Sequence, residues 1–173
     1  MAAISYADNF KWKNSVGDDL YRRGLYTFFK RTAPYPDLMV FDCPDANVAA
    51  IRRGVSNTPL QALTTLNAQT FTEAARALAE RVLELQGDDS ARAGFAFRRC
   101  LGREPSSTER DQLLALLQKA RAVFAADAEA TMKLTSGSSK KSPAGGEPSV
   151  TDLAAWIATA RIILNTDEFI TRE

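Results

Sequence analysis

The chain holds a complete helix start within eight residues, Ser56-Asn57-Thr58-Pro59-Leu60-Gln61-Ala62-Leu63. Thr58 carries the hydroxyl that suits an N-cap, and Pro59 follows at the first helical position, where a missing N–H costs no hydrogen bond. Gln61 comes three residues after the cap, so its side chain can accept the Thr58 N–H and complete a capping box. We therefore predict a helix from Pro59 to about Asn67, with an apolar ridge made of Leu60, Leu63 and Leu66.

Four further helices are predicted in the second half from apolar residues spaced three and four apart. Each begins at residues that can cap a helix, with capping boxes expected at Thr70 and at Ser106. A glycine at position 102 is the expected stop of the second of them. The predicted stretches are 70–86, 88–102, 106–134 and 149–164, with a final turn over 166–170. Residues 135–148 are rich in Ser, Gly, Lys and Pro and predict a flexible loop.

The first third of the chain has a less regular pattern. Residues 20–32 carry apolar side chains at helical spacing and are expected to be helical, although the run Tyr-Thr-Phe-Phe also favours strands. Three prolines predict an extended stretch over 33–48. The whole chain is therefore predicted to be all-α: a single domain over 1–173, an irregular bundle of five or six helices with an extended aromatic N-terminal segment.

Composition excludes several kinds of function. The 173 residues include no histidine, which removes the commonest general base and zinc ligand, and two cysteines cannot form a four-thiolate site. We expect no metal, no cofactor and no catalytic residue in this chain. A net charge of +1 gives no electrostatic argument for a nucleic-acid partner. No apolar run is long enough for membrane insertion, and the first eight residues do not resemble a signal peptide.

One group of polar residues is a candidate site, and each of its members also has a structural interpretation. Asp42 and Asp45 form a carboxylate pair suited to acid–base work, or they are turn residues on either side of a proline. Arg52 and Arg53 are suited to an anion, or they pair with those carboxylates. The remaining candidates are two side-chain amides, which either bind a ligand or stabilise the helix start: Asn57 and Gln61.

Aromatic residues gather in the same third of the chain. They are suited to a sugar-binding platform, or they cover the helical core, because aromatic side chains bury large apolar areas. We expect the second arrangement. The residues are Trp12, Tyr26, Phe28, Phe29, Tyr35 and Phe41.

Five ordered motifs resemble those of one family. They are RRGLYTFFKRT (22–32), FDCPD (41–45), SNTPLQALTTLN (56–67), FTEAARALAER (71–81) and LNTDEFITRE (164–173). Together they resemble the C-terminal part of a domain of unknown function abundant in planctomycetes. The chain departs from the family pattern at Cys43, where alanine is usual, and at 46–50, where many members have an Arg-Glu pair and a cysteine.

The resemblance implies a setting for the chain. Family members typically belong to large exported proteins, often with a c-type cytochrome-like domain, so the expected location is extracytoplasmic and the expected partners are other domains of the parent protein. Our first hypothesis is a structural or interaction module of such a protein. The alternative is part of an enzyme acting on carbohydrate, in which Asp42, Asp45 and nearby arginines complete a site with upstream residues.

Overall fold

The computed structural model describes residues 15–30, 34–44, 47–137 and 149–171. The chain divides into two compact units, Met1–Ser56 (unit 1) and Asn57–Glu173 (unit 2). The described residues form helices and turns without any strand, which confirms the all-α prediction. We predicted one domain over 1–173, and the helical bundle itself lies within unit 2.

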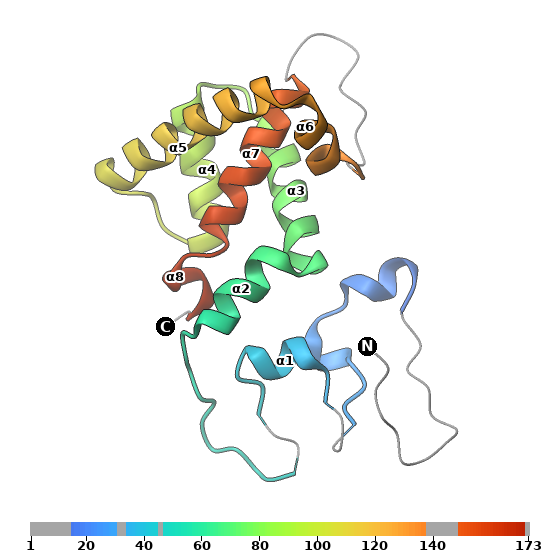
Figure 1. Ribbon diagram of the computed structural model, residues 1–173. Coiled ribbons are helices and arrows are strands. Elements are labelled where there is room, and N and C mark those ends of the chain that lie inside the picture. The colour runs from blue at the N-terminus through green and yellow to red at the C-terminus, as the bar shows by residue number, and fades with distance from the viewer. Residues whose placement is uncertain (1–14, 31–33, 45–46, 138–148, 172–173) are drawn as a thin grey trace. The chain divides into compact units, whose positions relative to one another are not determined.

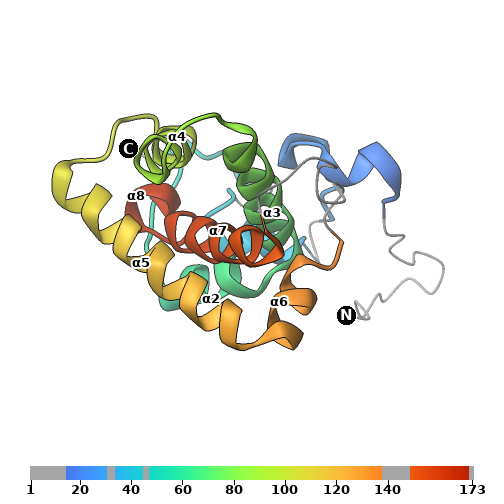
Figure 2. The same ribbon diagram turned by 90° about the horizontal axis from the view of Figure 1, so that it is seen from above.

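Unit 2 contains six described helices of eight or more residues, in agreement with the predicted number. Figures 1 and 2 show α7 in the middle, with α3 and α5 on either side of it. The helices are α2 (Pro59–Asn67), α3 (Gln69–Glu84), α4 (Asp89–Leu101), α5 (Ser107–Ala126), α6 (Ala128–Thr135) and α7 (Val150–Ile163), followed by the short α8 (Asp167–Ile170).

The core of unit 2 surrounds α7. Trp156, Ile157 and Ile163 of that helix are fully buried, and Leu117 of α5 and Val82 of α3 are buried against the same cluster. Fully burying one such side chain stabilises the fold by roughly 1.5–3 kcal/mol. The apolar stripe predicted over 149–164 is therefore the centre of the bundle.

Most of the predicted helix starts are confirmed. Thr58 and Gln61 form both hydrogen bonds of a capping box, and Ser106 with Glu109 does the same at the start of α5. Gly102 ends α4 with a φ of 78°, a left-handed conformation that glycine adopts without a Cβ clash. Local spacing is enough to predict these features because each bond joins residues three or four apart. The other confirmed caps are the side chains of Asp88 and Ser149.

Two predicted helix boundaries are wrong. Helix α3 begins at Gln69, one residue before the expected Thr70 capping box, and its N-cap is Ala68, which makes no side-chain cap bond. The long helix expected over 106–134 is two helices, because Asp127 leaves the helical conformation and its carboxylate accepts the Ala130 N–H at 2.9 Å. Of the predicted loop over 135–148, Thr135 is the last residue of α6, and 138–148 lie outside the described residues.

Unit 1 is less regular than predicted. In place of a helix over 20–32, the described part forms two 3-10 helices, Gly17–Tyr21 and Gly24–Tyr26. In place of an extended stretch over 33–48, α1 (Pro36–Val40) begins with proline at N1. None of these three elements has a buried residue, so no burial offsets the cost of starting a longer helix.

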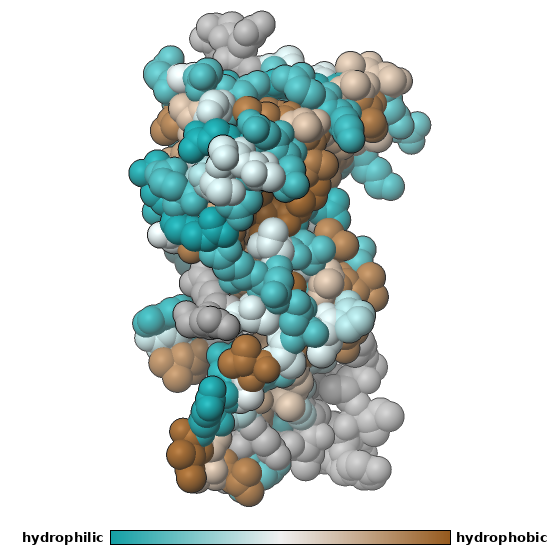
Figure 3. Space-filling model, turned by 90° about the vertical axis from the view of Figure 1, so that its left-hand side faces the viewer, coloured by the Kyte–Doolittle hydropathy of each residue, from teal (hydrophilic) through white to brown (hydrophobic). Residues whose placement is uncertain are grey.

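The predicted aromatic residues of unit 1 differ in exposure. Tyr26, Phe28 and Tyr35 are exposed, whereas Phe29 and Phe41 are partly buried. Figure 3 shows exposed hydrophobic residues interspersed with hydrophilic ones on the face that it draws. Trp12 lies outside the described residues.

The apolar ridge of α2 also differs from the prediction. Leu60 and Leu63 are each 57% exposed, while Gln61 and Thr65 on the same helix are 1% and 2% exposed. Polar contacts explain this orientation. The Thr65 hydroxyl donates to Asn165 Oδ1 at 2.5 Å, and the Arg161 guanidinium donates to the Leu66 carbonyl. The polar face of α2 is therefore the one turned into unit 2.

Candidate functional site

The six residues of the predicted polar cluster are divided between the two units. Asp42, Arg52 and Arg53 belong to unit 1, and Asn57 and Gln61 belong to unit 2. Asp45 lies outside the described residues. The geometry of each part is therefore considered by itself.

In unit 1, Asp42 and Arg53 close the loop between residues 42 and 56. The Asp42 carboxylate accepts hydrogen bonds from the Ser56 N–H at 2.8 Å and from the Ser56 hydroxyl at 2.8 and 2.9 Å. Arg53 donates to the Phe41 carbonyl and, at 3.1 Å, to the Asp42 carbonyl. Asp42 has a φ of 57°, which aspartate tolerates better than most residues. Arg53 thus holds backbone carbonyls, and Asp42 holds both the backbone and the hydroxyl of Ser56. Arg52 is exposed.

In unit 2, Asn57 and Gln61 hold the two ends of the unit's chain together. The Asn57 side-chain amide donates to Asp167 Oδ1 at 2.5 Å, which ties the entry of α2 to the first residue of α8. Gln61 Oε1 accepts the Thr58 N–H at 2.8 Å, and the Gln61 N–H donates to the Thr58 hydroxyl at 3.3 Å. These two hydrogen bonds confirm the capping role predicted for Gln61 from the sequence.

An ion-pair cluster around Arg103 was not predicted from the sequence. Its guanidinium donates to Glu109 at 2.8 and 3.0 Å and to Glu168 at 2.6 and 2.8 Å, and it lies 4.9 Å from the centre of the Phe97 ring. The Arg103 hydrogen bonds are the main reason that the pKa of Glu109 falls to about 2 and that of Glu168 is lowered. The cluster fastens α8 to the α4–α5 connection.

A second missed cluster is centred on Arg121 of α5. This guanidinium donates to both oxygens of Asp89, at 2.5 and 3.0 Å, and to Asp152 at 2.7 Å. Both carboxylates lie in the first turn of their helices, α4 and α7. The hydrogen bond from Arg121 lowers the pKa of Asp89, although partial burial opposes it. No sequence signal pairs these residues, because they are 31 and 32 positions apart.

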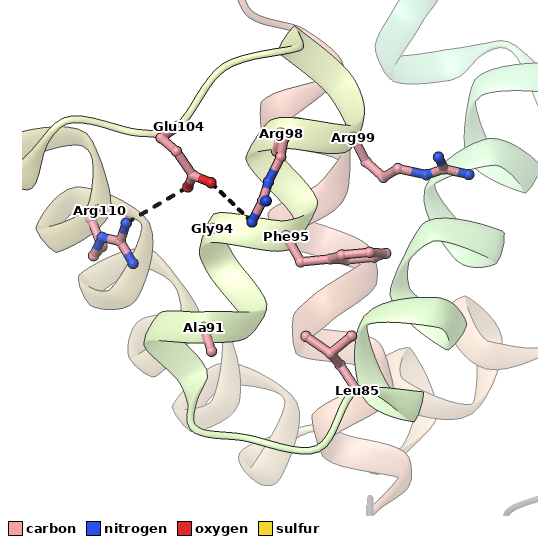
Figure 4. A pocket seen from close by; sticks show the side chains of 8 residues that line it. All are labelled: Leu85, Ala91, Gly94, Phe95, Arg98, Arg99, Glu104 and Arg110. Carbon is pink, nitrogen blue, oxygen red and sulfur yellow. Dashed lines mark ion pairs between the residues drawn. The ribbon is translucent and has the colours of Figure 1, made fainter.

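A groove on α4 is lined by three arginines. It has a volume of about 600 Å³, and Figure 4 shows Arg98 and Arg110 pointing toward Glu104 on one side of the helix. Arg98 pairs with Glu104 at 2.9 Å, and Arg110 approaches it at 4.0 Å. The groove is lined by Leu85, Ala91, Gly94, Phe95, Arg98, Arg99, Glu104 and Arg110.

Two features are absent from the part of the chain that the structure describes. No group of three or more acidic or cysteine side chains lies together where a metal ion could be held. No described helix combines the length and the apolar character that crossing a bilayer requires.

Comparison with known proteins gives one match. The family described as "PSD1: Protein of unknown function (DUF1553)" matches residues 3–117. The chain belongs to the DUF1553 family. No curated protein matches the chain, and no solved structure matches it.

The matched residues include four of the five motifs that suggested a family in the sequence. The DUF1553 match runs through unit 1 and through α2, α3 and α4 into α5. It ends at Leu117, so the closing motif over 164–173 lies beyond it. In the structure α7, which carries the centre of the core, also follows the matched region.

Proposed function

We propose that this chain is a structural and interaction module of a larger exported protein, and that its partners are other domains of that protein. The observation that carries the proposal is the orientation of α2. A helix normally turns its apolar face inward, yet α2 buries Gln61 and Thr65 and leaves Leu60 and Leu63 more than half exposed. Neighbouring exposed leucines on one helix face are suited to an apolar partner surface.

Unit 1 supports the same proposal. Its described apolar side chains include Leu25 at 83% exposure, and Val48, Ile51 and Val55 are exposed in the loop that Asp42 and Ser56 close. Membership of the DUF1553 family is compatible with a module whose own activity is unknown. The extracytoplasmic location and the cytochrome-like neighbour follow from the motif resemblance alone and belong to this proposal.

The proposal includes the absence of a cofactor of the chain's own. Elemental analysis of the purified chain is expected to find no stoichiometric zinc or iron, because histidine is absent and cysteines number two. About one metal ion per chain would contradict it. The alternative of a carbohydrate-acting enzyme has less support, since Asp42 directs its carboxylate to Ser56 within its own loop.

Hydroxyl-radical footprinting tests the interaction role, because oxidation reports the exposure of individual side chains. Leu60 and Leu63 should be oxidised several-fold more slowly in the larger parent protein than in this chain alone. Met132 on α6 and Val123 on α5 are exposed far from α2 in the sequence and serve as internal controls with unchanged rates. Equal rates for both leucines in the two proteins would refute the proposal.

A further inference from the structure

The geometry points to the groove on α4 as a binding site for an anion that carries an apolar body, such as an aryl phosphate or an aryl carboxylate. This inference is independent of the proposed interaction role, because the groove lies on α4, its flanking connections and the start of α5, whereas that role rests on α2 and unit 1. It rests on the charge balance, the walls and the floor of the groove.

The charge balance favours an anion. Arg98 and Arg110 lie beside Glu104, which leaves a net charge of +1 there, and Arg99 lines both this groove and the hollow at the end of α4. Arg98 makes a single pair with Glu104, and a guanidinium has five N–H donors, so most of its donors are available for a further oxygen atom. Arg110 is held by the Ser90 carbonyl and hydroxyl, both at 3.2 Å, and its other terminal nitrogen stays 4.0 Å from Glu104. Planar guanidinium groups bind phosphate and carboxylate groups through paired hydrogen bonds.

The groove also has apolar walls, formed by Leu85, Ala91 and Phe95. Figure 4 shows Phe95 and Leu85 on the other side of the α4 ribbon from the Arg110–Glu104 pair, so the apolar body of the ligand has to extend across the helix from the anionic group. Ligand sites commonly combine apolar walls with a few polar groups that orient the ligand. A second hollow, at the end of α4, lacks this net charge, because its lining holds two arginines, Arg99 and Arg103, and two carboxylates, Asp167 and Glu168.

Gly94 lines the floor of the groove. A Cβ atom at Gly94 would lie 3.4 Å from Glu104 Oε2 and 3.5 Å from Arg110 Nη1, so it would occupy space directly beneath the ion pair. Gly94 is in the interior of α4, where alanine favours the helix more than glycine does. Gly94→Ala is therefore expected to fold and at the same time to narrow the site.

An NMR titration of the full chain with phenyl phosphate tests the inference. Saturable shifts are expected in the amides of 91–99 and 104, with weaker binding at higher salt. Inorganic phosphate, which lacks the apolar body, and benzyl alcohol, which lacks the charge, should each bind at least about 5-fold more weakly. A parallel titration with benzoate shows whether a carboxylate is preferred to a phosphate.

Variants with opposite expected effects separate binding from folding. Arg98→Gln should weaken phenyl phosphate binding about 5- to 10-fold, and Gly94→Ala should weaken it as well. Glu104→Gln should strengthen it several-fold, because it removes the carboxylate that competes for Arg98 and Arg110. Arg81→Gln on α3 is the matched control and should have no effect. Shifts without saturation, shifts spread over arginines elsewhere, or weaker binding by Glu104→Gln would overturn the inference.

Discussion

Replacement of Arg121 by methionine is the most informative stability experiment on this fold. Methionine keeps much of the apolar stem and removes the guanidinium that joins Asp89 of α4 to Asp152 of α7. Because α5 carries Arg121, the change releases an ionic link among three helices of the bundle. The helices themselves and the apolar core are left in place.

The magnitude follows from burial and geometry. An exposed ion pair contributes about 0.2–1 kcal/mol, and breaking a fully buried one costs about 3–5 kcal/mol. The side chains of Arg121, Asp89 and Asp152 are 25%, 24% and 28% exposed, which places this cluster between the two limits. Asp89 and Asp152 also remain at helix N-termini, where each is stabilised by about 0.3–1 kcal/mol without the arginine. We therefore expect Arg121→Met to lower the free energy of unfolding by about 2 kcal/mol.

Urea denaturation followed by tryptophan fluorescence measures this loss, since Trp156 is 1% exposed at the centre of the core. Combining Arg121→Met with Asp152→Asn in a double-mutant cycle should give a coupling of about 1 kcal/mol. Arg81→Met, on the exposed face of α3, is the control and should stay within about 0.5 kcal/mol of the unmodified chain. A loss below about 0.5 kcal/mol for Arg121→Met would show that the cluster contributes nothing to stability.

Three further predictions concern local features. Thr58→Ala should cost about 1 kcal/mol in urea denaturation, the usual loss for an N-cap hydroxyl, and an unchanged midpoint would show that the cap contributes nothing. The pKa of Glu109 is lowered to about 2, so the pairing of Glu109 with Arg103 stabilises the fold above the ordinary glutamate pKa, and this stabilisation is lost as the pH falls toward 2. NMR titration of Arg103→Gln should show a higher pKa for Glu109. An unchanged pKa would contradict the pairing as its cause. Cys43 and Cys100 are free thiols in the structure, so titration under denaturing, non-reducing conditions should find two reactive groups in fresh monomer rather than none.

Features set by neighbouring residues could be predicted from the sequence. The capping boxes at Thr58 and Ser106 and the stop at Gly102 depend on contacts within one helical turn, so residue type and spacing are sufficient. Most of the surface of α7 is apolar, so the central position of this helix could also be predicted from its sequence pattern. The break at Asp127 is the exception, since aspartate is tolerated within helices and its capping role depends on where α6 packs.

Features that join distant parts of the chain were decided by tertiary structure. Arg103 meets Glu168 across 65 positions, and no periodic pattern specifies such a pair. The orientation of α2 is the clearest case, because its leucine ridge predicts one buried face, whereas Asn165 accepts from Thr65 and Arg161 donates to the Leu66 carbonyl on the other. A buried polar group left without a hydrogen bond costs free energy, so a helix can turn its polar face inward when distant parts of the chain supply the partners.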